Sequence, residues 1–190
     1  MSEVKYYEEL TNIIYSNVWL MNVLRTSREC DLPDWFVAAG AIRSIVWDKL
    51  HGYKDPTPIS DVDVIFYDRY DLTQERDKKA EVELSSCMPS VEWDAKNQAA
   101  VHLWYEDVFG FPIEPIVSSE DAINRWSPAS IGVRLLLDDS LYIYAPYGLT
   151  DLFEMKFRRN QTYIPIDSFL KKVKKSAIKE KWPMAQIVWD

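Results

Sequence analysis

Two carboxylates that stand two positions apart, Asp61 and Asp63, are the residues of this chain best suited to chemistry. The stretch around them alternates with an apolar set made of Val62, Val64 and Phe66. Alternation at period two predicts a β-strand, and residues i and i+2 of a strand project from the same face. Neighbouring carboxylates repel each other unless a cation lies between them, and hard oxygen ligands suit Mg²⁺ or Mn²⁺. The alternative is a pair of solvated residues at a strand end, because Asp-x-Asp is a short motif.

A second strand-like run, from 91 to 105, contains a third candidate carboxylate, Asp94. Apolar residues alternate with polar ones at both ends of this run, which predicts strand structure on each side of a polar middle. We expect Asp94 to lie on a strand that neighbours Asp61 and Asp63, where it would complete a two-metal carboxylate cluster. Polar groups inside a sheet need partners, so three residues of the middle are candidates to face a ligand: Lys96, Asn97 and Gln98.

An apolar run that ends in glycine, Trp35 to Gly40, precedes a helical pattern from Ala41 to Leu50. A strand, a glycine turn and a helix can together bind phosphate, because the free N–H groups of the first helical turn face an anion and glycine allows close approach. Arg43 and Ser44 stand near enough to the turn to reach the same anion. The alternative is a tight connection between strand and helix with no ligand.

The remaining patterns predict the scaffold. We expect helices over 5–28, 73–86 and 167–181, and a short helix that begins at 118–123 and is ended by 126–128. We also expect a hairpin of strands 131–137 and 141–145, and a helix that follows a turn at 146–151 and buries residues up to Phe157. The last helix places lysines on its outer face: Lys171, Lys172, Lys174, Lys175 and Lys179. This face either holds an anionic acceptor or is simply solvated.

Length and composition limit the classes of protein. The 190 residues are 47% hydrophobic, which is enough for one domain, 1–190, with a sizeable core. The formal net charge of −8 argues against non-specific DNA binding, which needs a basic field. Cys30 and Cys87 match no metal or redox spacing, the N-terminus is unlike a secretory signal, and no run is apolar enough to cross a membrane. We therefore expect a soluble, cytoplasmic protein.

Five blocks in order give the chain a family resemblance. They are 38–43 (AAGAIR), 46–52 (VWDKLHG), 61–64 (DVDV), 96–99 (KNQA) and 145–153 (APYGLTDLF). With Asp94 they resemble the DNA polymerase β-type nucleotidyltransferase superfamily and, more narrowly, a bacterial family of nucleotidyltransferase-like proteins of unassigned substrate. The turn from Gly40 to Arg43 is also similar to that of tRNA CCA-adding enzymes. The resemblance implies an α+β fold: a small mixed sheet flanked by helices, with an N-terminal helix and a C-terminal hairpin-plus-helix extension.

The resemblance also implies an activity, the transfer of a nucleoside monophosphate from an NTP to a hydroxyl acceptor with release of pyrophosphate. Asp61, Asp63 and Asp94 would be catalytic and hold Mg²⁺ or Mn²⁺. The residues expected to bind the nucleotide are Gly40, Ala41, Arg43, Ser44, Lys96, Asn97 and Gln98. The acceptor is left open among a small molecule, a protein hydroxyl and an RNA end.

One departure from the superfamily pattern keeps a second function open. Ala41 follows Gly40 where the superfamily turn usually has Gly or Ser, so a hydroxyl that would touch phosphate is lost, and Ser44 is a candidate replacement. The alternative is a catalytically weak member that binds a nucleotide or a protein partner, as antitoxin-like or regulatory relatives do. The three carboxylates favour the enzyme, and Ala41 favours the alternative.

Overall fold

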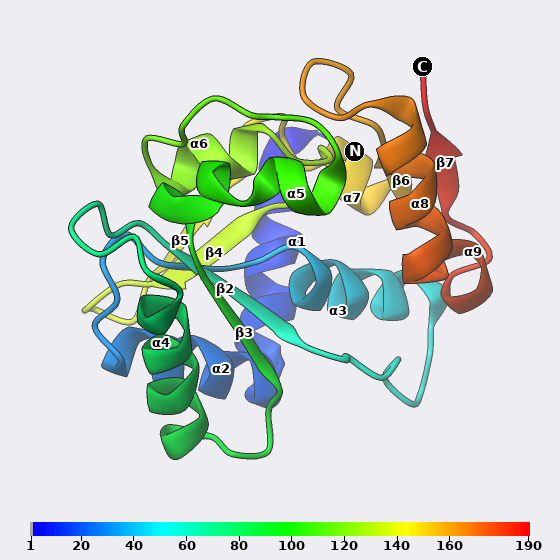
Figure 1. Ribbon diagram of the computed structural model, residues 1–190. Helices are drawn as coiled ribbons and strands as arrows, with labels where there is room; N and C mark the ends of the chain where they lie inside the picture. The colour runs from blue at the N-terminus through cyan, green and yellow to red at the C-terminus, as the bar shows by residue number, and fades with distance from the viewer. Residues whose placement is uncertain (1) are drawn as a thin grey trace.

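The computed structural model describes residues 2–190 and shows a five-stranded mixed sheet with helices on both faces (Figure 1). The strand order is β3-β2-β1-β4-β5. β2 and β3 are parallel, and the other neighbours are antiparallel. The strand bounds are β1 Phe36–Ala38, β2 Val62–Phe66, β3 Trp93–Asn97, β4 Gly132–Leu135 and β5 Leu141–Tyr144. The predicted α+β class and mixed sheet are confirmed. The predicted hairpin, β4 and β5, is present and joins the sheet through β1.

The helices and remaining strands complete the scaffold. Their bounds are α1 Glu3–Ser16, α2 Val18–Glu29, α3 Gly40–His51, α4 Gln74–Cys87, η1 Gln98–Leu103, α5 Tyr105–Phe109, α6 Ser119–Asn124, α7 Thr150–Phe153, β6 Lys156–Arg158, α8 Ile166–Ser176, α9 Ile178–Lys181 and β7 Gln186–Val188. In residues 2–190 no helix combines the length and the apolar character needed to cross a membrane.

The alternation along β2 decides which face of the sheet carries the carboxylates. Val62, Val64 and Phe66 are buried in the main core with α1 and α2. Ile65 points to the other face, where it joins a smaller core with Phe36 of β1 and residues of α6. Asp63 shares the face of Ile65, because successive side chains of a strand alternate between faces. The chemistry therefore lies on the face with the smaller core.

Several predicted elements differ from the structure in extent. The helix predicted over 5–28 is two helices, because Asn17 adopts an extended conformation (ψ 97°) and caps α2 by accepting the Leu20 N–H at 2.9 Å. The second half of the run 91–105 is the 3₁₀ helix η1, not a strand. The helix expected to reach Phe157 stops at Phe153, and Phe157 lies in β6, which pairs with β7.

The C-terminal segment is attached firmly to α3. The predicted last helix breaks at Ala177, where φ is 49°, into α8 and α9. Beyond the break, Trp182 packs edge-on against Trp47 of α3 with ring centroids 5.4 Å apart. The Trp182 indole N–H also donates to the buried Asp48 carboxylate at 2.7 Å. These contacts fix the end of the chain beyond α9 to α3.

The connection between β1 and α3 contains a strained residue. Ala39 has φ 53° and ψ −106°, a conformation that favours glycine, while Gly40 is already the first residue of α3. We expect Ala39→Gly to raise the free energy of unfolding by about 1 kcal/mol, because it removes the clash of the Cβ atom. Urea denaturation measures this change.

Ala38→Gly is the matched control for that substitution. Ala38 lies in β1 and is fully buried, so the same loss of one methyl group should lower the free energy of unfolding there. A loss of stability in both variants would contradict the assignment of strain to position 39.

Candidate active site

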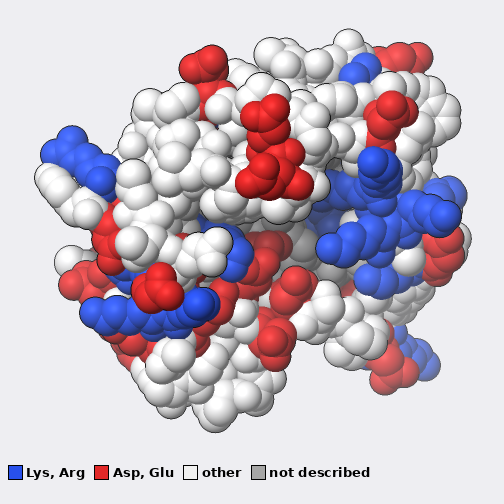
Figure 2. Space-filling view, viewed as in Figure 1, with Lys and Arg blue, Asp and Glu red and all other residues white. Residues whose placement is uncertain are grey.

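The three predicted carboxylates gather at one edge of the sheet. Asp63 lies directly opposite Asp94 in the parallel register of β2 and β3, so the two side chains share a face. Asp61 precedes β2 by one residue and belongs to the same face by alternation. The predicted neighbouring position of Asp94 is therefore confirmed. Figure 2 shows acidic side chains at the centre of the face that is toward the viewer.

Asp63 is the most perturbed of these carboxyl groups. Its pKa is raised to about 6, first by burial and then by the negative charges of Asp61 and Asp94. The ammonium of Lys172 and the backbone N–H of Gly40 oppose this rise. A carboxylate that is partly buried among like charges has a strong demand for a cation.

Lys96 supplies a cation to one member of the group. Its ammonium lies 2.7 Å from a carboxylate oxygen of Asp94 and 3.1 Å from one of Glu81. Burial by itself lowers the pKa of Lys96, but the hydrogen bonds to Asp94 and Glu81 outweigh it and raise the pKa overall. The predicted cation is therefore beside the carboxylates, where it is paired with protein acids and not directed at a phosphate.

The donor chemistry fits a divalent ion. Asp61 and Asp63 offer hard oxygens at i and i+2, and the raised pKa of Asp63 records an unmet demand for positive charge. Within residues 2–190 no three carboxylate, His or Cys side chains converge on one point. Asp94 is turned to Lys96, and Asp61 accepts the Ser60 hydroxyl at 2.6 Å. The ion pair occupies the Oδ1 atom of Asp94.

Of the residues at the turn between β1 and α3, Gly40 lies directly against one of the carboxylates. The backbone of Gly40 lies against Asp63, since a Cβ atom at position 40 would be 3.7 Å from its Oδ2 atom. The side chain of Ala41 is fully buried in the core, so only its backbone N–H can meet a ligand. The hydroxyl of Ser44 donates to the Gly40 carbonyl at 2.8 Å. The predicted contact of Ser44 with a phosphate would require this hydroxyl to turn away from the carbonyl.

Arg43 is a buried cation. It is 7% exposed, and its guanidinium lies over the rings of Trp47 and Phe157, 5.5 and 5.0 Å from their centroids. Its Nε atom has no hydrogen-bond partner in the described part of the chain. Burial lowers the pKa of Arg43 to about 10, and the nearby Asp63 opposes that change. A buried guanidinium with an unused donor is suited to an anion that enters the site.

Asn97 and Gln98, which we predict to face the sugar or base, are both buried, and their side-chain amides contact the backbone of the protein. The Asn97 amide donates to the carbonyls of Asp68 and Asp71 at 2.7 and 2.8 Å and accepts the Asp68 N–H at 2.9 Å. Gln98 is 5% exposed and donates to the Lys96 carbonyl. The side-chain amide of Asn97 thus finds its hydrogen-bond partners in the loop that follows β2, and it holds that loop in place.

Lys172 of α8 is the residue of the site that the sequence reasoning missed. The side chain of Lys172 is exposed, and its pKa is lowered by desolvation of the ammonium group and by the charge of Arg43. Asp63 acts in the opposite direction. Figure 2 shows the basic patch over α8 beside the acidic centre, with a hollowed area between them. The sequence shows that the lysines recur along this helix, but it does not show which of them faces the carboxylates.

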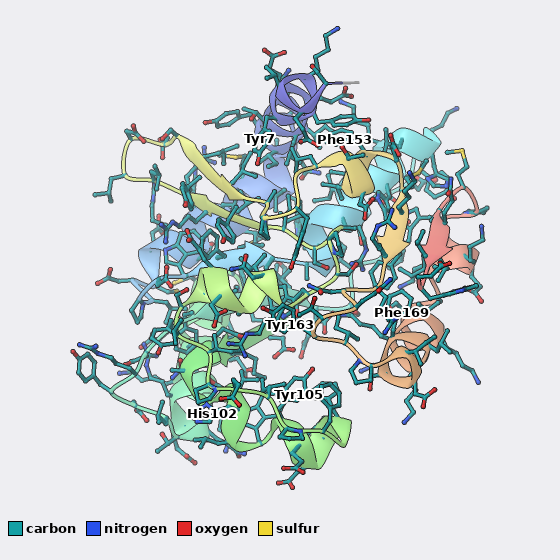
Figure 3. All side chains as sticks on the ribbon, turned by 90° about the horizontal axis from the view of Figure 1, so that it is seen from above. Tyr7, His102, Tyr105, Phe153, Tyr163 and Phe169 are labelled. Atoms are coloured by element: carbon teal, nitrogen blue, oxygen red, sulfur yellow. The ribbon has the colours of Figure 1, made fainter. Side chains whose placement is uncertain are left out.

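A stacked pair of aromatic rings explains why Lys172 reaches the site. Phe169 is buried against Phe157 of β6 with ring centroids 5.5 Å apart (Figure 3). Phe157 in turn lies beneath Arg43. Lys172 is three residues after Phe169 on α8, so both side chains lie on the same side of the helix. α8 is thus fixed with Lys172 toward Arg43 and Asp63.

The fold and the grouped carboxylates are those of the polymerase β-type nucleotidyltransferase superfamily. A solved NMR structure described as revealing a CCA-adding enzyme head domain matches with a TM-score of 0.78 and 25% identity, covering 96% of each chain. A family model described as nucleotidyltransferase matches residues 25–187. The chain therefore belongs to that nucleotidyltransferase family. No protein of curated function matches the chain.

The raised pKa of Asp63 makes a prediction about stability and pH. A group whose pKa is higher in the folded chain stabilises at low pH, and this contribution is lost as the pH rises through about 6. In metal-free buffer, Asp63→Asn should therefore gain stability relative to the parent chain between pH 4 and 7, by on the order of 2 kcal/mol. Urea titrations at several pH values measure the difference.

Asp107→Asn is the control for this titration, because Asp107 is exposed on α5. Its stability should follow the parent chain at every pH. A difference between Asp63→Asn and the parent chain that does not change with pH would refute the account.

Proposed function

We propose that the protein transfers a nucleoside monophosphate from an NTP to a hydroxyl acceptor. The observation that carries the proposal is the register of Asp63 against Asp94, beside Asp61, with the cations Arg43 and Lys172 next to this acidic group. The carboxylates would bind a metal ion, and the neighbouring cations would bind the phosphates of the nucleotide. Membership of the nucleotidyltransferase family supports the same reaction.

In the proposed reaction, an acceptor hydroxyl oxygen forms a bond to the α-phosphorus of the NTP. The bond from this phosphorus to the bridging oxygen breaks, pyrophosphate leaves with the bonding electrons, and the hydroxyl proton passes to water. Asp61 and Asp63 would hold Mg²⁺ or Mn²⁺, with Asp94 as the third ligand. The bound ion would neutralise phosphate charge and lower the pKa of the hydroxyl.

The chain itself supplies the phosphate-binding groups. Arg43 offers an unused guanidinium N–H, and Lys172 offers an ammonium held close to it. The Gly40 N–H is directed at Asp63. The N–H group of Ala41 beside it stands in the first turn of α3, before the first backbone hydrogen bond of the helix, which runs from the Arg43 N–H to the Ala39 carbonyl. The guanidinium, the ammonium and the Ala41 N–H would together hold the β- and γ-phosphates and orient the α-phosphorus toward the acceptor.

A catalytically weak nucleotide-binding protein is the second candidate function. Two observations favour it: Ala41 offers no hydroxyl in the turn, and Asp94 is paired with Lys96 and not turned to its carboxylate partners. Both functions require NTP binding, but only the enzyme releases pyrophosphate. Incubation with each labelled NTP and cell extract distinguishes them, since the transferase produces a labelled acceptor together with pyrophosphate.

The role proposed for Lys172 predicts a change in nucleotide affinity. Lys172→Ala should weaken binding of ATP with Mg²⁺ by roughly 10- to 100-fold, the loss of one charge-assisted contact. Lys174→Ala is the matched control, because residue 174 lies about 200° around α8 from residue 172. Isothermal titration calorimetry measures both affinities. Equal affinities in the two variants would remove Lys172 from the site.

The proposed metal ligands predict a loss of Mn²⁺ binding. Asp61→Asn and Asp63→Asn should each abolish the binding heat of Mn²⁺, while the fold is retained because carboxylate repulsion is relieved. Asp107→Asn, on exposed α5, should bind Mn²⁺ like the parent chain. Circular dichroism checks the fold. Mn²⁺ binding that persists in both site variants would place the ion elsewhere.

A further inference from the structure

A groove of about 470 Å³ opens beside Asp61, and the described residues that line it include none of α8. It lies between the connector that precedes β2 and the turn that precedes β3. The residues that determine its character are Trp19, Pro56, Pro58, Asp61, Pro89 and Glu92. Asp61 belongs both to this groove and to the proposed metal site. A molecule in the groove is therefore adjacent to the reacting centre.

The charges of the groove select its ligand. Asp61 and Glu92 are both exposed and negative, and no Lys, Arg or His is among the described residues that line it. Two carboxylates without a counter-charge attract an ammonium group and repel phosphate, and the net charge of −8 acts in the same direction. The half-buried Trp19 and three prolines give it apolar walls that suit the C–H face of a small saturated ring.

The groove is held open by its own hydrogen bonds. Thr57 of the connector donates its N–H and its hydroxyl to the buried Asp48 carboxylate at 2.7 and 2.6 Å. On the opposite wall, the Val91 N–H donates to the Met88 carbonyl at 3.2 Å, and the Glu92 carbonyl accepts the Val62 N–H at 2.9 Å. Both walls are thus fixed before a ligand arrives, which lowers the entropy cost of binding.

We propose that this groove binds the acceptor, and that the acceptor is a small hydroxyl compound carrying at least one ammonium group. The inference rests on the proposed nucleotidyl transfer. The anionic NTP would occupy the side of Arg43 and Lys172, and the cationic acceptor the side of Asp61 and Glu92. An acceptor hydroxyl would then attack the α-phosphorus from the acidic side, with the same bond changes and pyrophosphate release. A phosphate-bearing acceptor such as an RNA end is disfavoured by the groove.

The test uses the full chain labelled with ¹⁵N and follows the indole N–H signals by NMR, with Trp19→Phe to identify the signal of Trp19. The probes are 2-deoxystreptamine, a cyclitol with two ammonium groups, its uncharged counterpart myo-inositol, and a short RNA. We expect 2-deoxystreptamine to shift the Trp19 signal and to bind at least tenfold more tightly than myo-inositol. The RNA should leave the signal unchanged.

Two charge-matched variants locate the binding. Glu92→Gln should weaken 2-deoxystreptamine about three- to fivefold. Glu180→Gln removes the same charge from exposed α9, outside the groove, and should have no effect. An unshifted Trp19 signal, equal binding of the two cyclitols, or equal effects of the two variants would overturn the inference.

Binding of ATP with Mg²⁺, measured on the same samples by calorimetry, separates this inference from the proposed function. Normal ATP binding together with a failed groove test refutes the acceptor assignment alone. A chain that binds 2-deoxystreptamine in the groove but binds no NTP refutes the transfer, and with it the assignment of the groove to an acceptor.

Discussion

The repulsion among three carboxylates at one edge of the sheet is the constraint on which the rest of the site depends. Parallel pairing fixes Asp63 opposite Asp94, and strand alternation adds Asp61 to the same face. Burial and like charge raise the pKa of Asp63 to about 6, which shows how unfavourable this concentration of charge is without a cation. Two lysines offset this charge: Lys96 forms an ion pair with Asp94, and Lys172 lies near Asp63. The acidic centre is thus bounded by cations that belong to the chain.

The C-terminal segment is as much a part of this balance as the sheet. Its aromatic residues fix it to α3 and β6: Trp182 packs on Trp47, and Phe169 stacks on Phe157. These contacts bring Lys172 to the side of Arg43, whose guanidinium lies over Trp47 and Phe157. One aromatic cluster therefore supports both cations. This arrangement explains why two positive charges are held close together in a protein of net charge −8.

The sequence predicted the parts of the structure that local pattern determines. The strand of Asp61 and Asp63, the helix after Gly40 and the adjacent strand of Asp94 follow from periodicity, because alternation and helical spacing are properties of consecutive residues. The contacts of Asn97 could not be predicted, because its partners, Asp68 and Asp71, come close only when the chain folds. The contacts of Gln98 and Ser44 could not be predicted either, because a polar side chain can bond to a nearby backbone carbonyl or to a ligand, and the sequence does not distinguish the two. Lys172 was predicted to lie on the outer face of its helix, because the apolar residues of that helix define a single buried face and the lysines lie off it. Which side faces the site depends on rings far away in the sequence.

The central claim is that Asp61 and Asp63 hold a divalent ion while Arg43 and Lys172 hold the phosphates of an NTP. A crystal structure of the full chain with Mn²⁺ and a non-hydrolysable ATP analogue, measured with anomalous scattering, tests both halves at once. The account predicts an anomalous peak coordinated by Asp61 and Asp63, Asp94 released from Lys96, and the triphosphate against Arg43 and Lys172. A nucleotide bound away from these cations, or a manganese peak away from the two carboxylates, would contradict it.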